Sequence, residues 1–403
     1  MKKKNKLVDR RYLVPFILIT SLFFLWGFAR AILDVLNKHF QDELHISITQ
    51  SSLIQVTTYL GYFLMAIPAG MFINRYGYRK GVIFGLSIFG LGALSFIPGM
   101  HVGTFYAYLV SLFVIGCGLV VLETAANPYS TVLGPESTAS SRLNLSQTFN
   151  GMGCFMATFL VGQYLFRSDG GSGDVTVPYM VMGIVVLCVA VVFAFVDLPE
   201  IQGQDNSSED NERPLTLSSS ITSLFCHNGF KWGLMALLAY EVAEISINSY
   251  FVNFVTGEGW MDKNGASVVI SFALVIFMVG RFVSSAIMRY VRAEKLLLIC
   301  ALGTVICMLI ILLYPGKLSL YVLILNYLLE AMMFPTIFSI ALRGLGRLTK
   351  SASSLLMMTP VGGCGFMLMG LAADMTGSMT LPFIIPLLGY SVIALYSLYI
   401  VKS

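Results

Sequence analysis

Ionisable side chains inside otherwise apolar segments are the residues of this sequence best able to do chemistry. Five of them are acids and two are bases: Asp34, Glu123, Glu241, Glu244, Glu330, Arg30 and Arg281. A charged side chain at the centre of a membrane-sized apolar segment costs about 2.5–3.5 kcal/mol on insertion scales, so its presence needs a reason. The functional interpretation is a hydrated cavity whose carboxyls bind substrate hydroxyls and exchange protons. The alternative is internal ion pairing that holds helices together.

Arg30 and Asp34 are spaced i, i+4 and so share one helix face. Burial favours the neutral form of a carboxyl, whereas a nearby guanidinium favours the charged form. A site that alternates between wet and dry surroundings can therefore exchange a proton at each turnover. The spacing allows either a permanent structural pair or a switchable one.

Amide side chains accompany two of these segments. Glu123 and Asn127 lie one turn apart, and Gln147 and Asn150 follow in the next apolar segment. Amides and carboxylates offer the donors and acceptors that a polyhydroxylated ligand needs, which favours a sugar. Hydrogen bonding between neighbouring helices is the other explanation for the amides.

The composition excludes a soluble globular protein. Of 403 residues, 57% are hydrophobic and only 11% are charged, and the mean hydropathy is +0.80. About a quarter of the residues of a soluble protein are charged. A membrane-spanning helix needs about 20 mostly apolar residues, so the chain can supply about 12. The basic amino terminus runs into an apolar stretch that is too long for a signal peptide and lacks a cleavage site before Trp26, so we expect it to be the first membrane helix.

Gly, Pro and charged residues separate the chain into two sets of six apolar segments. The segments lie near 12–38, 50–74, 81–98, 104–127, 144–166, 177–197, 230–256, 266–288, 296–314, 318–342, 353–373 and 381–401. The sequence therefore predicts an all-α integral membrane protein with 12 transmembrane helices. We expect an N-terminal six-helix bundle (1–197), a polar cytoplasmic linker (198–228) and a C-terminal six-helix bundle (229–403).

The two sets of segments resemble each other at an offset of 207 residues. Asp34 aligns with Glu241, and Glu123, which precedes Pro128 by five residues, aligns with Glu330, which precedes Pro335 by five. A duplicated six-helix unit predicts two pseudo-symmetric bundles. It is typical of alternating-access transporters, whose site lies near the bilayer midplane between the halves.

The basic residues indicate an orientation. Of the 25 Lys and Arg residues, 19 fall in the termini and loops on the side of the amino terminus, four fall on the other side and two lie within spans. The positive-inside rule then places both termini in the cytoplasm of a multi-pass protein. This clustering also explains the net charge of +4 without nucleic acid. The partners that we expect are a lipid bilayer, a small-molecule substrate and an ion, and we expect a monomer.

Several other classes of protein lack support in the sequence. The seven cysteines show no CxxC spacing, so they indicate neither a disulfide framework nor a metal site. No HExxH pair, GxSxG elbow or Walker loop is present, so we expect no enzyme, no cofactor and no ATP-driven pump. A transporter-like sensor that binds sugar without moving it remains an alternative.

Several motifs resemble the major facilitator superfamily, and more closely its fucose:proton symporter family of bacterial sugar permeases. Residues 70–80 (GMFINRYGYRK) are similar to the loop motif between helices two and three of the superfamily, with Asn74 where an aspartate is usual. The more specific motifs are 122–128 (LETAANP), 133–136 (LGPE), 142–150 (RLNLSQTFN), 280–282 (GRF) and 334–338 (FPTIF).

The resemblance implies roles for individual residues. It implies proton coupling and substrate recognition for Asp34 and Glu123, and substrate binding by the amides Gln147 and Asn150. We expect the full substrate-binding set to be Arg30, Asp34, Glu123, Asn127, Gln147, Asn150, Glu241, Glu244 and Glu330. Conformational gating is expected from Arg75, Gly77, Arg79 and Arg281. Arg30, Glu241 and Glu330 depart from the family, where these positions are uncharged, and this argues against fucose itself.

The sequence-based hypothesis is a proton-coupled monosaccharide symporter of the bacterial inner membrane. An arginine at position 30 suggests an acidic sugar, such as sialic acid or a hexuronate, whose carboxylate pairs with the guanidinium while Asp34 is protonated. The competing explanation is a permanent Arg30–Asp34 or Arg30–Glu241 pair in a transporter of a neutral sugar: fucose, glucose/galactose or N-acetylglucosamine. The coupling ion is expected to be H⁺, with Na⁺ as the alternative.

Overall fold

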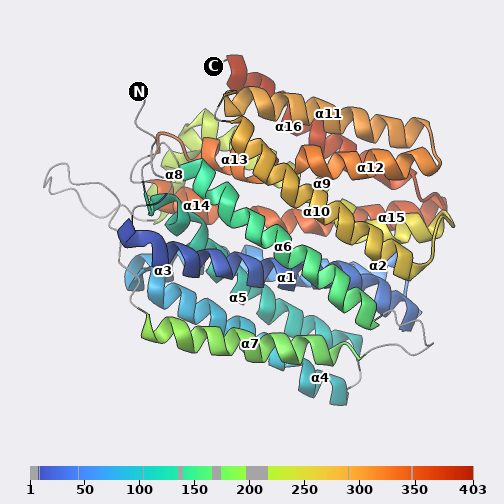
Figure 1. Ribbon diagram of the computed structural model, residues 1–403, viewed down its shortest axis with the longest axis horizontal. Coiled ribbons are helices and arrows are strands. Elements are labelled where there is room, and N and C mark those ends of the chain that lie inside the picture. Colours follow the sequence, from blue (N-terminus) through green and yellow to red (C-terminus); the bar gives the residue numbers. More distant parts are fainter. Residues whose placement is uncertain are drawn as a thin grey trace, which may run out of the picture.

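The computed structural model describes residues 8, 10–43, 45–102, 104–134, 139–165, 174–196, 217–288, 290–345 and 348–402. Every regular element within these ranges is a helix. The long helices run side by side along one axis, as a bundle that crosses a membrane must (Figure 1).

The N-terminal half contains seven α-helices and one short 3₁₀ turn among the described residues. They are η1 (Arg10–Tyr12), α1 (Leu13–Glu43), α2 (Ile48–Ser51), α3 (Leu53–Leu94), α4 (Phe96–Val102), α5 (Phe105–Val132), α6 (Ala139–Leu165) and α7 (Thr176–Phe195). The described helices that follow are α8 (Leu217–Cys226), α9 (Asn228–Gly257), α10 (Lys263–Ile287), α11 (Ala293–Leu313), α12 (Lys317–Glu330), α13 (Met333–Ala341), α14 (Thr349–Leu356), η4 (Thr359–Cys364), α15 (Gly365–Thr376), η5 (Leu381–Phe383) and α16 (Ile384–Lys402).

The prediction of 12 membrane crossings is confirmed. Nine described segments are long and apolar enough to cross a membrane. One of them, Ile48–Gly99, has 52 residues, and its helix α3 is interrupted at Gly77 (φ 84°, ψ 170°), so it makes two crossings. The helices α6 and α9, with 27 and 30 residues, complete the set although they are more polar than the others.

The tenth predicted span is broken rather than continuous. We expected one helix over 318–342, but α12 ends at Glu330 and α13 begins at Met333. The cause is Pro335, which has no N–H to donate to the carbonyl of Ala331 one turn earlier. Nε of Arg281, on α10, donates to this carbonyl oxygen at 3.1 Å instead.

The eleventh predicted span, 353–373, is also broken. It consists of α14, the 3₁₀ segment η4 and α15. The break contains Gly362 and Gly363, which allow other helices to come very close. A Cβ atom on Gly362 would lie 2.8 Å from the backbone nitrogen of Val242 on α9, and one on Gly363 would lie 2.4 Å from the ring of Tyr59 on α3.

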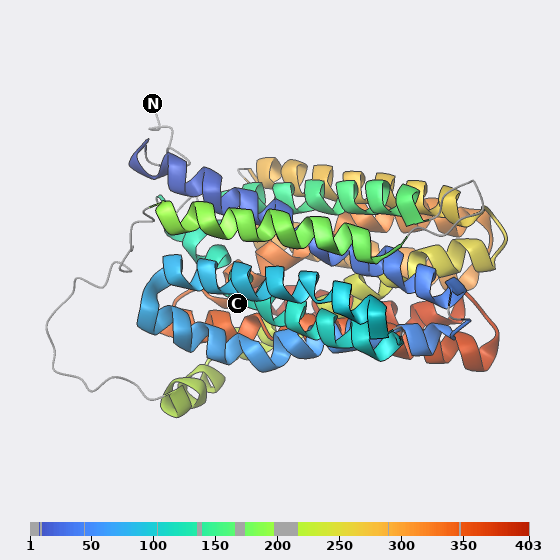
Figure 2. The ribbon, with the colours of Figure 1, turned by 90° about the horizontal axis from the view of Figure 1, so that it is seen from below.

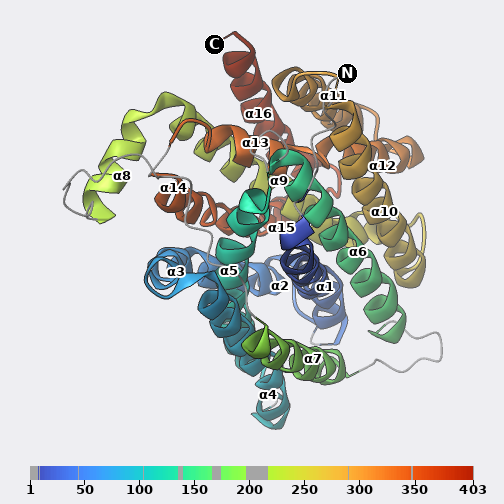
Figure 3. The same cartoon turned by 60° about the vertical axis from the view of Figure 1, so that its left-hand side comes forward.

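The helices of each half gather on opposite sides of the molecule, with α6 beside α10 at the boundary (Figure 3). Most of the linker predicted at 198–228 lies outside the described residues, which resume at 217. Its last part forms α8 rather than an irregular polar stretch, with Leu224 buried. This helix lies at the end of the bundle where α1 begins (Figure 2), which we call the linker end; the opposite end is called the far end.

Polar contacts join the two halves at the far end. Nζ of Lys263 lies 2.7 Å from a carboxylate oxygen of Asp42, at the start of α10 and the end of α1. Thr49 on α2 donates to Asp374 on α15 through its hydroxyl at 2.5 Å and its backbone N–H at 3.1 Å. The residues between the halves are therefore covered at this end.

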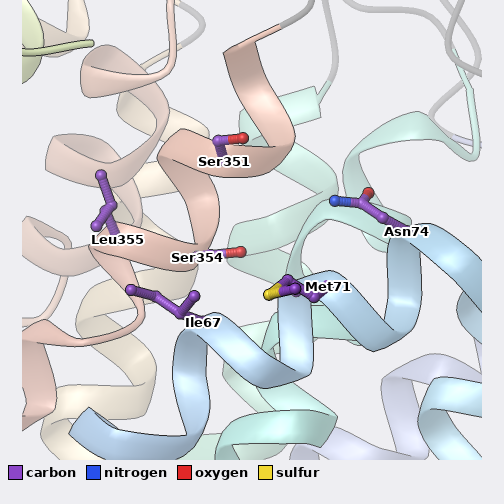
Figure 4. Close-up of a pocket in the computed structure, with 7 residues that line it drawn as sticks. Ile67, Met71, Asn74, Ser351, Ser354 and Leu355 are labelled. Carbon is purple, nitrogen blue, oxygen red and sulfur yellow. The ribbon is translucent and has the colours of Figure 1, made fainter. Parts of the chain in front are cut away.

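The halves also meet towards the linker end. Ile67, Met71 and Asn74 of α3 face Ser351, Ser354 and Leu355 of α14 across a small cavity (Figure 4). A Cβ atom on Gly70 would lie 2.1 Å from the hydroxyl oxygen of Ser354, so a larger residue there would require the Ser354 side chain to move. The halves therefore touch towards both ends of the bundle, with the polar residues between these contacts.

Candidate functional site

The two crossings that are least apolar carry four of the nine predicted substrate-binding residues. Helix α6 supplies Gln147 and Asn150, and α9 supplies Glu241 and Glu244. Both helices lie at the interface between the halves: α6 packs on α1 and α10, and α9 packs on α1 as well as on its own half. The polar face that lowers the hydropathy of these helices is thus turned to the partner half rather than to lipid.

Arg30 forms ion pairs across the interface. One of its terminal nitrogens, Nη2, donates to Oε2 of Glu241 at 3.1 Å and to Oε2 of Glu244 at 2.7 Å. The side chain of Glu241 is fully buried, that of Glu244 is 9% exposed and that of Arg30 is 24% exposed. Glu244 also accepts from the amide of Asn248 at 2.8 Å. The guanidinium of α1 is therefore held by two carboxylates of α9.

Asp34 has a different partner from the one that its spacing suggested. Its Oδ1 accepts from the hydroxyl of Ser249 on α9 at 2.7 Å. Ser249 in turn accepts from the amide of Gln55 on α3 at 2.9 Å. Of the two pairs that we considered for Arg30, the pair with Glu241 is present and a pair with Asp34 is absent among the described contacts. Asp34 is left bound only by uncharged donors.

Glu123 and its neighbouring amides form a continuous polar row in the N-terminal half. Tyr62 on α3 donates its hydroxyl hydrogen to Oε1 of Glu123 at 2.8 Å. One turn later, Oδ1 of Asn127 accepts from the amide of Gln147 at 3.4 Å. Asn150 lies one turn further on in α6, and its amide donates to the backbone oxygen of Phe23 at 3.3 Å. The predicted substrate-binding amides are therefore brought together beside Glu123.

Arg281 lies within this row of amides and not at a loop. Its Nη1 donates to the backbone oxygen and Oε1 of Gln147, at 3.0 and 3.2 Å, and more weakly to Oδ1 of Asn150 at 3.4 Å. Its guanidinium carbon lies 4.3 Å from the centre of the Phe277 ring. Gating, which we expected of Arg281 together with the loop motif, stays a prediction. The structure places Arg281 on the predicted ligand-binding side chains.

Glu330 and its hydrogen-bond donors form a second polar cluster, within the C-terminal half. It is fully buried at the last residue of α12. Its Oε2 accepts from the hydroxyl of Tyr390 on α16 and from the amide of Asn326 at 3.0 Å. The other oxygen, Oε1, has no hydrogen-bond partner among the described residues.

The loop motif lies at the linker end, away from the polar interface. Gly77 has the positive φ that a non-glycine residue adopts only at a cost, and it divides α3 into its two crossings. Arg79 donates to the backbone oxygens of Phe193 and Ala194, at the end of α7, at 3.4 and 2.6 Å. Arg75 is exposed, with its guanidinium 5.3 Å from the ring of Tyr76. The motif thus ties α3 to α7 within one half.

Sequence reasoning missed the uncharged partners of the carboxyls. These are Gln55, Tyr62, Ser249, Asn248, Asn326 and Tyr390. Tyrosine, serine and asparagine are common in membrane helices, so their presence is a weak signal. The i, i+4 spacing of Asn326 and Glu330 and of Glu244 and Asn248 could have indicated two of these bonds.

Two six-helix halves that enclose a polar, carboxyl-rich interface define a polytopic membrane protein of the transporter class. Residues 19–367 match the sequence profile of the Major Facilitator Superfamily. The chain belongs to this superfamily, which confirms the prediction that it is not an enzyme.

The relatives that it matches extend over nearly the whole chain. An L-fucose-proton symporter of Escherichia coli (strain K12) is 34% identical, with 96% of this chain and 93% of the relative covered. A glucose/galactose transporter of Brucella abortus is 32% identical, with the same coverage. A crystal structure of the transporter FucP in the outward conformation superposes with a TM-score of 0.80 at 33% identity, covering 97% of this chain and 99% of that one. The resemblance to the fucose:proton symporter family is confirmed.

Proposed function

We propose that this protein imports a neutral sugar together with protons across a bacterial inner membrane, by alternating access of one site between its two halves. The names of its relatives support a sugar as the substrate, since they are described as carriers of L-fucose or of glucose and galactose. The row formed by Glu123, Asn127, Gln147 and Asn150 supplies hydroxyl-binding groups on two adjacent helices.

The observation that carries the choice of a neutral sugar is the double ion pair of Arg30. Both of its bonded carboxylates come from the chain itself, so its charge is already compensated. Glu241 and Glu244 already pair with this guanidinium, so a substrate carboxylate would bring a third negative charge to a group that carries one positive charge. The acidic sugar suggested by Arg30 alone is therefore not retained.

Asp34 and Glu123 are the proposed proton-coupling residues. Neither forms an ion pair among the described residues, and each is bound by a hydroxyl group, of Ser249 and Tyr62. A carboxyl that is bound by a hydroxyl donor and forms no ion pair has no fixed cation to neutralise it, so a proton can fill that role. Sugar hydroxyls can then bind the adjacent amides while the carboxyls hold the protons.

The orientation that we propose places the linker end in the cytoplasm. The excess of Lys and Arg in the loops of that side supports it. Accessibility of single cysteines introduced at Lys231 and at Lys263 to a membrane-impermeant thiol reagent tests it in whole cells, in a background without the native cysteines. Labelling of the Lys231 position and protection of the Lys263 position would reverse the proposed orientation.

An uptake screen in proteoliposomes tests the function. The probes are L-fucose, D-glucose, D-galactose, N-acetylglucosamine, N-acetylneuraminate and D-glucuronate, each with a pH gradient, with a Na⁺ gradient and with neither. We expect at least one neutral sugar to accumulate only with the pH gradient. Accumulation of the acidic sugars alone, or of none of the probes, would refute the proposal, and dependence on Na⁺ would refute proton coupling.

A further inference from the structure

Glu330 has surroundings that favour opposite states of its carboxyl. It is fully buried, and no Lys or Arg among the described residues lies within ion-pairing distance of it, which favours the neutral acid. Its Oε2, however, accepts two hydrogen bonds, from Tyr390 and Asn326, and this arrangement favours the ionised form. A permanently protonated acid would need an acceptor for its hydrogen, and Oε1 has none here.

The internal repeat aligns Glu330 with Glu123, which we have proposed as a proton-coupling residue. Glu330 precedes Pro335 by five residues, as Glu123 precedes Pro128, and the two glutamates are 207 residues apart. Each accepts a hydrogen bond from a tyrosine hydroxyl of another helix, Tyr62 for Glu123 and Tyr390 for Glu330. Each half therefore contains a buried carboxyl bound by tyrosine at the same point of the repeat.

We propose that Glu330 is a proton-binding site of the C-terminal half, which takes up and releases a proton in each transport cycle in addition to the protons carried by the N-terminal half. The inference rests on the proposed symport function. A proton from water on one side of the membrane forms the O–H bond at Oε1, and the same bond is broken when the proton is released to water on the other side. No further reactant is needed.

The groups around Glu330 allow such a cycle. Two charged side chains, Arg281 on α10 and Glu244 on α9, act on the Glu330 carboxyl, and their electrostatic effects have opposite signs. The neutral titratable ones are Tyr240 on α9, Cys307 on α11, Tyr327 on α12 and Tyr390 on α16.

Arg281 also connects Glu330 to the ligand-binding amides. It binds Gln147 and Asn150 on one side and the carbonyl of Ala331, the residue after Glu330, on the other. A sugar that binds the amides and draws the guanidinium towards itself takes a positive charge away from this carboxyl, which favours its protonated form. This displacement links sugar binding to uptake of the proton, as symport requires.

Infrared spectroscopy of the purified protein without sugar tests proton binding directly. We expect the carboxylic C=O band to be lost as the pH rises, and we expect Glu330→Gln to remove one carboxyl from this change. The change is followed above about pH 6, where carboxyls exposed to water are already ionised. In that range Glu258→Gln, next to the end of α9 and outside the interface, is the matched control and should leave the change as in the wild type. A titration that is identical in wild type and Glu330→Gln would overturn the proposal.

Transport in proteoliposomes tests whether the proton is coupled. For a neutral sugar and a gradient of about one pH unit, each coupled proton raises the accumulation ratio about tenfold. Among the four neutral sugars of the screen, the one that accumulates should reach a ratio about tenfold lower in Glu330→Gln than in wild type or Glu258→Gln. Because Gln mimics a protonated carboxyl, an unchanged ratio would mean that Glu330 never cycles, and the proposal would be wrong.

Two further outcomes separate the possible failures. If wild type accumulates none of the sugars, the proposed function fails, while the infrared titration still decides whether Glu330 exchanges a proton. If Glu330→Gln does not fold, Tyr390→Phe replaces it: this change removes one donor that stabilises the ionised carboxyl, so loss of the band should move to higher pH. An unmoved titration in Tyr390→Phe would overturn the proposal.

Discussion

Replacing Arg30 by glutamine removes the positive charge that, among the described residues, neutralises Glu241 and Glu244. Glu241 is fully buried, so in the variant it must either stay charged without a partner or take up a proton. Removal of one partner of a buried ion pair costs about 3–5 kcal/mol. We therefore expect Arg30→Gln to be less stable than the wild type.

The size of the loss depends on pH. Protonating a carboxyl with an ordinary pKa of about 4.3 costs about 1.4 kcal/mol for each pH unit above that value, or about 4 kcal/mol at about pH 7.5 and about 1.6 kcal/mol at about pH 5.5. The folded variant binds a proton that its unfolded chain does not hold near neutrality, so its stability falls as the pH rises. The defect should shrink by about 2–3 kcal/mol between these two pH values.

Unfolding of the purified protein in detergent at the two pH values, beside the wild type, measures this effect. Arg30→Gln combined with Glu241→Gln is the matched control, since it replaces Arg30 and its fully buried partner by neutral groups and should recover most of the stability. Full stability of Arg30→Gln near neutral pH, or an equal loss at both pH values, would refute the reasoning that Arg30 is compensated by these carboxylates.

Three further outcomes are expected. Asp34→Asn and Glu123→Gln should each lower uphill sugar accumulation at least about tenfold for a gradient of about one pH unit while leaving sugar counterflow, and wild-type accumulation in either variant would remove that residue from the coupling mechanism. Arg79→Gln should lower the transport rate with little change in apparent affinity, because it breaks hydrogen bonds to the end of α7, far from the ligand site. A loss of affinity at a normal transport rate would contradict this. Gly363→Val should prevent close packing against Tyr59 and reduce the folded yield at least severalfold by size-exclusion chromatography, whereas unchanged yield would show that the contact is dispensable.

The number of crossings and the identity of the buried charges could be predicted from the sequence, because apolar segments and the charges inside them are local properties. The partners of those charges could not. Asp34 was the local candidate for Arg30, but the observed partners, Glu241 and Glu244, lie 211 and 214 residues further along the chain. Only the packing of α1 against α9 decides between them.

The break in the tenth crossing illustrates the same limit. Pro335 indicates by itself that one backbone carbonyl is left without its helical partner. It does not indicate that the donor is Arg281, which belongs to α10 and is 50 residues from Ala331. The motif that contains Arg281 suggested gating by its resemblance alone, and its contact with Gln147 became visible only when α6 and α10 were placed side by side.

The polarity of α9 has a consequence for the biogenesis of the protein. Two glutamates near the centre of one helix cost about 5–7 kcal/mol of insertion free energy if they leave the translocon charged and alone. The cation that neutralises them is on α1, which is synthesised about 200 residues earlier and is strongly apolar. We therefore expect the amino-terminal half to act as an insertion partner for the carboxy-terminal half, so that a fragment starting at residue 229 integrates into membranes efficiently only when residues 1–197 are co-expressed.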